Sequence, residues 1–192
     1  MIETTALSAV EEFSARFTKQ AGMLYPAKDP SDAVSIINGL IKSRGKGESC
    51  CSDKIEVSYQ GSKTHISPLV TTTVTYDALK KDPRKLVGLL DVGITKADYG
   101  IAETGSIVDV SFSDESRLLS SLTRVHIAVL ERNRIQDKLS MLSPIMKDFL
   151  NPSNGRKKPA ITFIGGPSRT SDIELKSVLG VHGPHEVHVV LL

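Results

Sequence analysis

The stretch that decides the fold is Val125-His-Ile-Ala-Val-Leu130, which is nearly all apolar. A strand that is covered on both faces needs such a run, because neither side of it meets water. Two further strands are expected after it, at residues 160–164 and 187–192, with a helix before each. The first helix is expected to bury Ile135, Leu139, Leu142, Met146 and Phe149, with Asn133 and Gln136 as a cap-like pair, and the second covers 171–179.

This order of strand, helix, strand, helix, strand predicts parallel strands that are joined by right-handed crossovers. The fold class is therefore expected to be α/β, an open and mostly parallel sheet with helices on both faces. A length of 192 residues suits one domain with a substantial core, and no linker divides the chain. We expect a single domain over 1–192, in which an N-terminal helical part of about 1–45 packs on the α/β core.

The first half of the chain predicts two helices followed by shorter elements. Apolar residues three and four apart predict a helix over roughly 5–20, and Ser31 is the expected cap of a second helix that ends near Gly45. The small and polar stretch 45–53 is typical of a loop, and 62–80 has no clear period. The remaining expected elements are a strand over 55–59, a helix over 85–91, strands over 99–102 and 106–112 around a turn at 103–105, and a short helix capped by Ser113.

The composition excludes several classes of function. A net charge of +2 and an aromatic content of 5% provide neither a basic field nor stacking platforms for nucleic acid. No apolar run approaches the roughly 18 residues of a membrane span, and the N-terminus lacks a signal-peptide pattern, so the expected location is the cytoplasm. Cys50 and Cys51 are adjacent and are expected to be reduced thiols or, alternatively, a redox pair. Two cysteines cannot hold a four-cysteine iron–sulfur cluster.

The first candidate site is the loop Gly165-Gly-Pro-Ser-Arg-Thr170, which follows the expected strand at 160–164. Ligands of open α/β sheets bind at the carboxyl ends of the strands. Gly165 and Gly166 allow close approach, the hydroxyls of Ser168 and Thr170 can donate hydrogen bonds, and Arg169 can bind a carboxylate or phosphate. These features, with the free amides of a helix that begins here, predict a site for an anionic group.

A structural alternative exists for the same loop. Ser171 and Glu174 have capping-box spacing, and Asp172 also neutralises the helix dipole, so the loop can be a well-capped helix start without a ligand. The loop lacks the Gly-Lys-Ser/Thr ending of a phosphate-binding Walker motif.

The second candidate site is the turn Glu103-Thr104-Gly105-Ser106. A carboxylate at the end of a strand can act as a nucleophile or a general base, which makes Glu103 the candidate catalytic residue. It can equally be a solvated turn residue, in which case Thr104, Gly105 and Ser106 bind a ligand without chemistry.

The histidines near the C-terminus do not predict a metal site. His182, His185 and His188 are three residues apart, and only a helix would turn all of them to one side. Gly183-Pro184 forbids a helix there. His182 is therefore expected to be a hydrogen-bonding wall residue beside the 165–170 loop, and His188 to lie on a strand, on the same face as Glu186. His126, inside the apolar run, is expected to be a core histidine whose hydrogen bonds are satisfied.

Several motifs in order resemble one known family. They are Gly93-Ile-Thr-Lys-Ala-Asp-Tyr-Gly-Ile-Ala-Glu-Thr-Gly-Ser106, Gly166-Pro-Ser-Arg-Thr-Ser-Asp-Ile-Glu174 and Leu179-Gly-Val-His-Gly-Pro184. Together they resemble the LUD-domain family, of the lactate utilisation protein C (LutC/YkgG) type. The resemblance is strong over about 90–192, and the N-terminal half is divergent. It implies a Rossmann-like three-layer sandwich similar to the NagB/RpiA/CoA-transferase superfamily.

The same resemblance implies a function. The chain would be an auxiliary subunit of a complex that oxidises L-lactate to pyruvate, with the iron–sulfur clusters on partner subunits and no cofactor bound by this chain alone. Family membership does not fix a substrate. The alternative is a stand-alone enzyme or binding protein for an anionic ligand such as a sugar phosphate, CoA ester, nucleotide or folate. Whether the chain is itself an enzyme stays open at this point.

Overall fold

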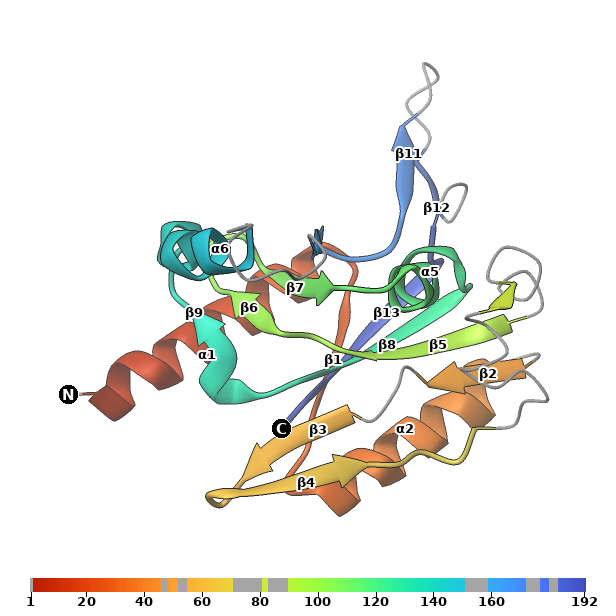
Figure 1. Cartoon of the computed structure of the whole chain (residues 1–192), viewed down its shortest axis with the longest axis horizontal. Coiled ribbons are helices and arrows are strands. Elements are labelled where there is room, and N and C mark those ends of the chain that lie inside the picture. Colours follow the sequence, from red (N-terminus) through yellow and green to blue (C-terminus); the bar gives the residue numbers. More distant parts are fainter. Residues whose placement is uncertain are drawn as a thin grey trace.

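A computed structural model of the chain describes residues 2–45, 48–51, 55–70, 81–82, 90–150, 159–171, 177–179 and 183–192. Within these ranges a parallel five-stranded sheet lies at the centre of the molecule (Figure 1). In order across the sheet, its strands are β1 (Met23–Pro26), β13 (Glu186–Leu191), β8 (Val125–Leu130), β5 (Leu90–Lys96) and β2 (Glu48–Cys51). Every residue of β8 is buried, as its apolar run predicts. The fold is α/β with a mostly parallel central sheet.

One face of this sheet is covered by α2 (Pro30–Arg44) and by the hairpin of β3 (Ile55–Tyr59) and β4 (Ser62–Ile66). Their apolar side chains form one core with Val92, Ile94, Val125 and Ile127 of the sheet. The helix begins after Asp29, whose carboxylate accepts a hydrogen bond from the Asp32 N–H at 2.8 Å. The prediction of Ser31 as the cap is therefore wrong, because Pro30 suits the first turn and leaves the capping position to Asp29.

The opposite face carries α1 (Ile2–Lys19) and α5 (Asp114–Leu122), as the expectation of helices on both sides requires. Phe13 and Phe17 of α1 stack with ring centroids 5.6 Å apart, and they share a core with Val187, Val189 and Leu191 of β13. Ser113 caps α5, as predicted, by accepting a hydrogen bond from the Ser116 N–H.

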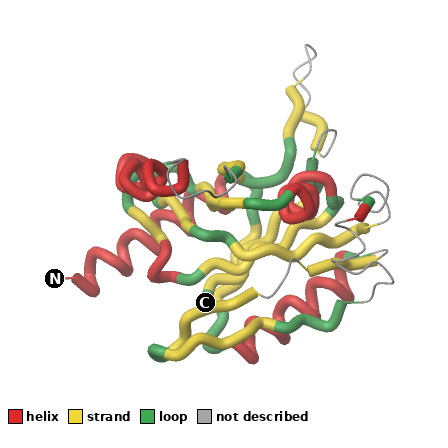
Figure 2. Tube along the Cα trace, in the orientation of Figure 1, coloured by secondary structure: helices red, strands yellow, loops and turns green. Residues whose placement is uncertain are grey.

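A second, four-stranded sheet lies on this side of the molecule. Its order is β10 (Ala160–Ile164), β7 (Ser106–Ser111), β6 (Tyr99–Ile101) and β9 (Ile135–Gln136). Its outer face packs against the short helices η2 (Leu139–Leu142) and α6 (Ser143–Leu150), which follow η1 (Arg132–Arg134). The strands β11 (Arg169–Ser171) and β12 (Ser177–Leu179) form a hairpin that projects from the body (Figures 1 and 2).

Two expectations for the C-terminal half are wrong. The strand 160–164 exists, but it pairs antiparallel with β7 in the second sheet and is not part of the parallel sheet. Residues 171 and 177–179, expected in a helix, lie in β11 and β12, and 172–176 fall outside the described residues. Ser171, expected in the capping box of that helix, instead pairs with Ser177 in the antiparallel pair of β11 and β12.

The helix expected to start near Asn133 begins only at Ser143. Asn133 lies in η1, and Gln136 pairs with Ile101 in β9, so they do not form a cap-like pair. The contact of Ile135 with the core between the sheets favours a short strand over a helical turn.

Two expectations for the N-terminal half also need correction. The predicted loop 45–53 contains β2, whose Ser49 and Cys50 are buried beside β5. These small side chains fit the sheet edge without giving a hydrophobic signal in the sequence. Of the helix expected over 85–91, residues 85–89 lie outside the described ranges, and Leu90 and Asp91 begin β5.

The packing of α5 on the central sheet depends on Gly93 in β5. A Cβ atom at this position would lie 2.3 Å from the Leu119 carbonyl oxygen and 2.8 Å from Thr123 Oγ1. The helix backbone therefore approaches the strand more closely than any side chain would permit.

We expect Gly93→Ala to lower the free energy of unfolding by about 1–3 kcal/mol, because the new methyl group must displace helix backbone. Gly39→Ala is the matched control, since a Cβ at that exposed position of α2 meets nothing within 4 Å. It should instead stabilise the protein by about 0.5–1 kcal/mol. Urea unfolding of both variants measures the difference, and equal effects would contradict the close approach of α5.

Candidate functional site

The two predicted site loops meet at Gln20, just after the end of α1. The side-chain Nε2 of Gln20 donates hydrogen bonds to the carbonyl oxygens of Thr104, at 2.8 Å, and Gly105, at 3.1 Å. The backbone oxygen of Gln20 accepts a hydrogen bond from Arg169 Nη2 at 2.8 Å. One residue therefore joins the 103–106 turn to the 165–170 loop, although it is separated from Arg169 by 149 positions in sequence.

Glycines in both loops allow this contact with α1. Gly105 has φ +61°, and a Cβ there would lie 2.5 Å from Arg16 Cβ. Gly166 has φ +147°, and a Cβ there would lie 2.5 Å from the Gln20 carbonyl oxygen. The sequence predicts the close approach of a ligand at Gly165 and Gly166 and a turn at Gly105. In the structure, the atoms that lie closest to Gly105 and Gly166 belong to Arg16 and Gln20.

Arg169 does not stand at a helix start. It begins β11 and is exposed. Ser168 donates its backbone N–H to the Pro184 carbonyl oxygen at 2.9 Å, and Pro167 is buried. The expected free amides of a helix start are therefore absent from the described part of this loop, in which Arg169 is an exposed cationic side chain. The backbone of Thr170 pairs with Val178 in the hairpin, and His182 lies outside the described residues.

Glu103 has structural partners on the neighbouring segment. Its Oε2 accepts a hydrogen bond from the Leu139 N–H at 3.0 Å, and its own N–H donates to the Asp137 carbonyl oxygen at 3.0 Å. The exposed carboxylate thus fastens the end of β6 to the start of η2. A catalytic role for Glu103 stays a prediction.

The two loops do not lie at the carboxyl ends of the central strands, where ligands of open α/β sheets bind. Gln20 precedes β1, and Pro184, the partner of Ser168, precedes β13. The joined loops consequently lie beside the amino ends of these two central strands. The rule fails because the strands that lead into the loops, β6 and β10, belong to the second sheet.

An ion pair that the sequence did not predict lies at the carboxyl ends of β5 and β8, and its carboxylate is buried. Lys96 Nζ lies 2.8 Å from Glu131 Oε1, and the Glu131 side chain is only 3% exposed. Glu131 Oε2 also accepts a hydrogen bond from the Ser58 N–H at 3.0 Å. The pair therefore ties the β3 hairpin to the central sheet. The sequence feature that could have pointed to this pair is the position of Glu131, directly after the apolar run Val125–Leu130.

Polar side chains are also buried between the two sheets. His126 Nε2 lies 2.8 Å from Thr95 Oγ1, and burial lowers the pKa of His126 to about 3, so its ring is neutral. His126 is a core histidine, as predicted, and its Nε2 has a hydrogen-bond partner. Its Nδ1 has no partner among the described residues.

Asp109 faces the same space from β7. Burial raises the pKa of its carboxyl group to about 6; the nearby Asp98 also raises it, and a hydrogen bond with Ser120 opposes the shift. Its Oδ2 has no hydrogen-bond partner among the described residues. The sequence offered a weak signal, a carboxylate at an alternating position of an apolar strand.

His188 lies on the face of β13 that packs towards α2, with Glu186 as predicted. His188 Nε2 is 3.0 Å from Glu186 Oε2, and Nδ1 is 3.2 Å from the Tyr25 hydroxyl. Burial lowers the pKa of His188, and the hydrogen bond with Glu186 opposes this. Within the described ranges, no group of three or more His, Cys, Asp or Glu side chains is arranged to hold a metal ion. No helix of the described chain is long and apolar enough to cross a membrane.

The chain matches a known protein family. The sequence model of the LUD domain family covers residues 10–192 of the chain. The chain belongs to the LUD domain family. A crystal structure of a DUF162 family protein from Deinococcus radiodurans has a similar fold, with a TM-score of 0.57, 16% sequence identity and 97% coverage of both chains.

Three curated proteins show how this LUD domain chain is related to known ones. Lactate utilization protein C of Exiguobacterium is 35% identical over 130 residues, which are 64% of this chain and 54% of that protein. The protein of the same name from Bacillus pumilus is 25% identical over 95% of this chain and 79% of its own length. YkgG of Escherichia coli is 37% identical over 48% of this chain and 40% of its own length. The chain spans about half the length of the first of these relatives.

The buried carboxyl of Asp109 predicts a pH dependence of stability. Its folded-state pKa is raised, so the native state binds this proton more tightly than the unfolded state. Ionisation of the buried Asp109 carboxyl therefore lowers the free energy of unfolding above pH of about 6. This loss of stability disappears as the pH falls towards about 4. We expect Asp109→Asn to be more stable than the wild type by about 1–3 kcal/mol at pH 7, with no difference near pH 4. Chemical unfolding of both proteins between pH of about 4 and about 7 tests this prediction. A stability difference between them that does not change with pH would contradict the ionisation of a buried Asp109.

Proposed function

We propose that this chain is an auxiliary subunit in lactate utilisation, acting in a complex that oxidises L-lactate to pyruvate. The observation that carries the proposal is the LUD domain match over residues 10–192, together with relatives named lactate utilization protein C. Because the chain matches about half the length of the first of these relatives, the activity of the whole complex is part of the proposal.

The thiol chemistry of the chain supports an auxiliary role. Clusters of the iron–sulfur type are held by cysteine thiolates, commonly four of them. The chain has two cysteines, and burial raises the pKa of the Cys50 thiol to about 11, which opposes the thiolate form that a metal requires. We therefore assign electron transfer to iron–sulfur partner subunits and a binding or positioning task to this chain.

The test is affinity purification of the tagged chain from its native cell, grown on lactate and processed without oxygen. We expect iron–sulfur proteins to be recovered in fixed proportion to the chain, and the eluate to oxidise L-lactate with an artificial electron acceptor. Cells grown without lactate provide the control. Recovery of the folded chain alone under both conditions would contradict the proposal.

A second candidate is a protein that binds an anionic ligand, such as a sugar phosphate, CoA ester, nucleotide or folate. The observation that favours it is the exposed Arg169 at the junction where Gln20 joins the two loops. Arg169 Nη2 donates to the Gln20 carbonyl oxygen, and the Gln20 side chain in turn donates to the 103–106 turn. A planar guanidinium held in this way is suited to binding a carboxylate or phosphate. Glu103 would then orient the ligand or act on it.

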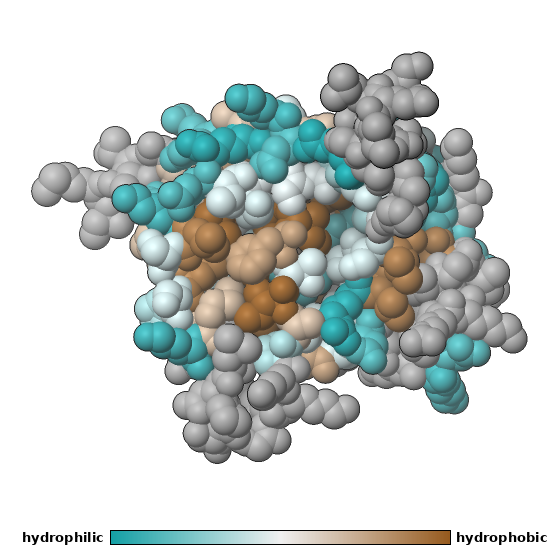
Figure 3. Space-filling view, turned by 90° about the horizontal axis from the view of Figure 1, so that it is seen from above, coloured by the Kyte–Doolittle hydropathy of each residue, from teal (hydrophilic) through white to brown (hydrophobic). Residues whose placement is uncertain are grey.

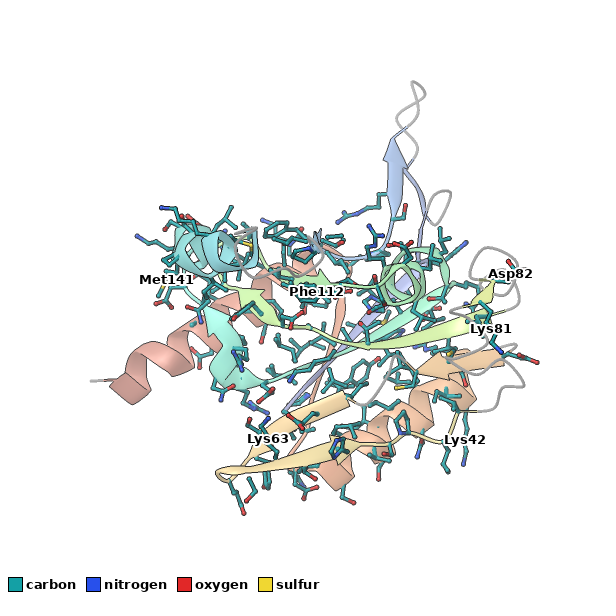
Figure 4. All side chains as sticks on the ribbon, in the orientation of Figure 1. Lys42, Lys63, Lys81, Asp82, Phe112 and Met141 are labelled. Atoms are coloured by element: carbon teal, nitrogen blue, oxygen red, sulfur yellow. The ribbon has the colours of Figure 1, made fainter. Side chains whose placement is uncertain are left out.

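Thermal unfolding in the presence of each ligand class tests this candidate. A ligand at a hundred times its dissociation constant should stabilise the protein by about 2.7 kcal/mol, and Arg169→Ala should remove most of that effect. Lys63→Ala is the control for loss of a positive charge, because Lys63 lies on β4 on the opposite side of the central sheet (Figure 4). An equal loss in both variants, or no stabilisation by any of the anions, would reject the site.

A further inference from the structure

The strand β10 forms an edge of the second sheet. It pairs with β7 over Ala160–Ile164, and no strand in the described part of the chain pairs with its other side. Its sequence, Ala-Ile-Thr-Phe-Ile, contains neither a charge nor a proline. An apolar edge without these devices is a template for another strand, because its outer N–H and C=O groups can pair with a second chain.

Other sheet edges in the described structure carry protection that β10 lacks. β1 ends in Pro26, β2 has an irregular register between Glu48 and Ser49, and β4 carries Lys63. β9, at the far edge of the second sheet, has only two residues. Short length, proline, irregular register and lysine each discourage pairing between edges. Compared with these edges, β10 is the one that lacks a proline, a charge and an irregular register.

The hydrogen-bond pattern shows which groups of β10 face outward. Asp98 N–H donates to the Val108 carbonyl oxygen, so Val108 of β7 faces β6. Residues alternate in an antiparallel ladder, so Asp109 faces β10 and forms a hydrogen-bonded pair with its partner Thr162. It follows that the N–H and C=O groups of Ile161 and Phe163 point away from β7, towards the open edge.

We infer that two copies of this chain associate by pairing their β10 strands antiparallel, about a two-fold axis through Thr162. In this register Ile161 of each copy lies opposite Phe163 of the other. Both residues present outward N–H and C=O groups, so the two strands exchange about four hydrogen bonds. The two Thr162 side chains meet on the inner face, where a Thr–Thr cross-strand pair is favourable. The pairing joins the two second sheets into one continuous sheet.

The side chains of β10 suit a second copy as the partner. Phe163 is 50% exposed, although it lies on the same face as Ile161, which packs against the core beneath α6. The pairing places each exposed Phe163 against Ile161 of the second copy and brings no like charges together. Figure 3 shows apolar side chains gathered on the upper side of the molecule, the side on which Figure 4 labels Phe112 and Met141. A two-fold interface is self-complementary by construction, which fits an uncharged strand.

The expected dimer is weak. One short strand pair buries less than the roughly 1,200 Å² of a standard interface, so we expect a dissociation constant in the micromolar range. Sedimentation velocity of the full chain over about 1–500 μM should show a monomer–dimer equilibrium. Amide hydrogen exchange should show Ile161 and Phe163 becoming protected as concentration rises, while Thr162 is protected at all concentrations.

Phe163→Pro is the decisive variant, because it removes an outward N–H without removing a hydrogen bond to β7. We expect it to raise the dissociation constant about tenfold or more. Phe163→Val is the matched control, since it keeps the N–H and an apolar strand-forming side chain, and it should still dimerise. Circular dichroism confirms that both variants are folded.

Three outcomes would overturn the inference. They are a wild-type monomer at every concentration, protection of the Ile161 and Phe163 amides that does not depend on concentration, and a dimer whose affinity is unchanged in Phe163→Pro. The second outcome would mean that another part of the same chain covers the edge. The third would place the interface elsewhere on the surface. If Phe163→Pro is unfolded, the concentration dependence of the wild-type amides decides alone.

Discussion

The structure depends on the complete burial of β8 at the centre of the parallel sheet. Both faces of this strand are covered, and it pairs with β13 on one side and β5 on the other. The core beneath α2 and the core beneath α1 each take alternate residues from it, Ile127 for the first and Ala128 for the second. The strand thus contributes side chains to both cores, and burial keeps the ring of His126 neutral.

The sequence predicted the elements whose burial pattern is simple, and it failed where the partner of a strand lies far away in the chain. The run at Val125–Leu130 and the alternation at Ile55–Tyr59 were sufficient for β8 and β3. Nothing local distinguishes β10, an antiparallel edge strand, from a parallel strand, because the same apolar residues serve either arrangement. The capping spacing after Thr170 was compatible with both a helix and a hairpin, and tertiary structure decided between them.

The structure brings the two predicted loops together through a residue that the sequence did not single out. The sequence selected the 103–106 turn and the 165–170 loop, and the structure joins them through Gln20, which carries no motif of its own. Gln20 escaped notice because its importance comes from its position after α1. Its side-chain amide donates hydrogen bonds to two backbone carbonyl oxygens. Every residue has such an acceptor, so the sequence does not show which ones are used. Gly105 and Gly166 were recognised as loop glycines, and the backbone that packs closely against them belongs to Arg16 and Gln20.

The pairing of β1 with β13 has a consequence for how the protein is made. The first strand of the sheet finds its partner more than 160 positions later, at the register Met23 with His188. While the chain leaves the ribosome, Phe13 and Phe17 of α1 have no β13 to pack against. Non-local pairing of this kind slows folding and prolongs the exposure of apolar surface. The N-terminal helix is thus the segment for which we expect the greatest need of chaperone protection during translation.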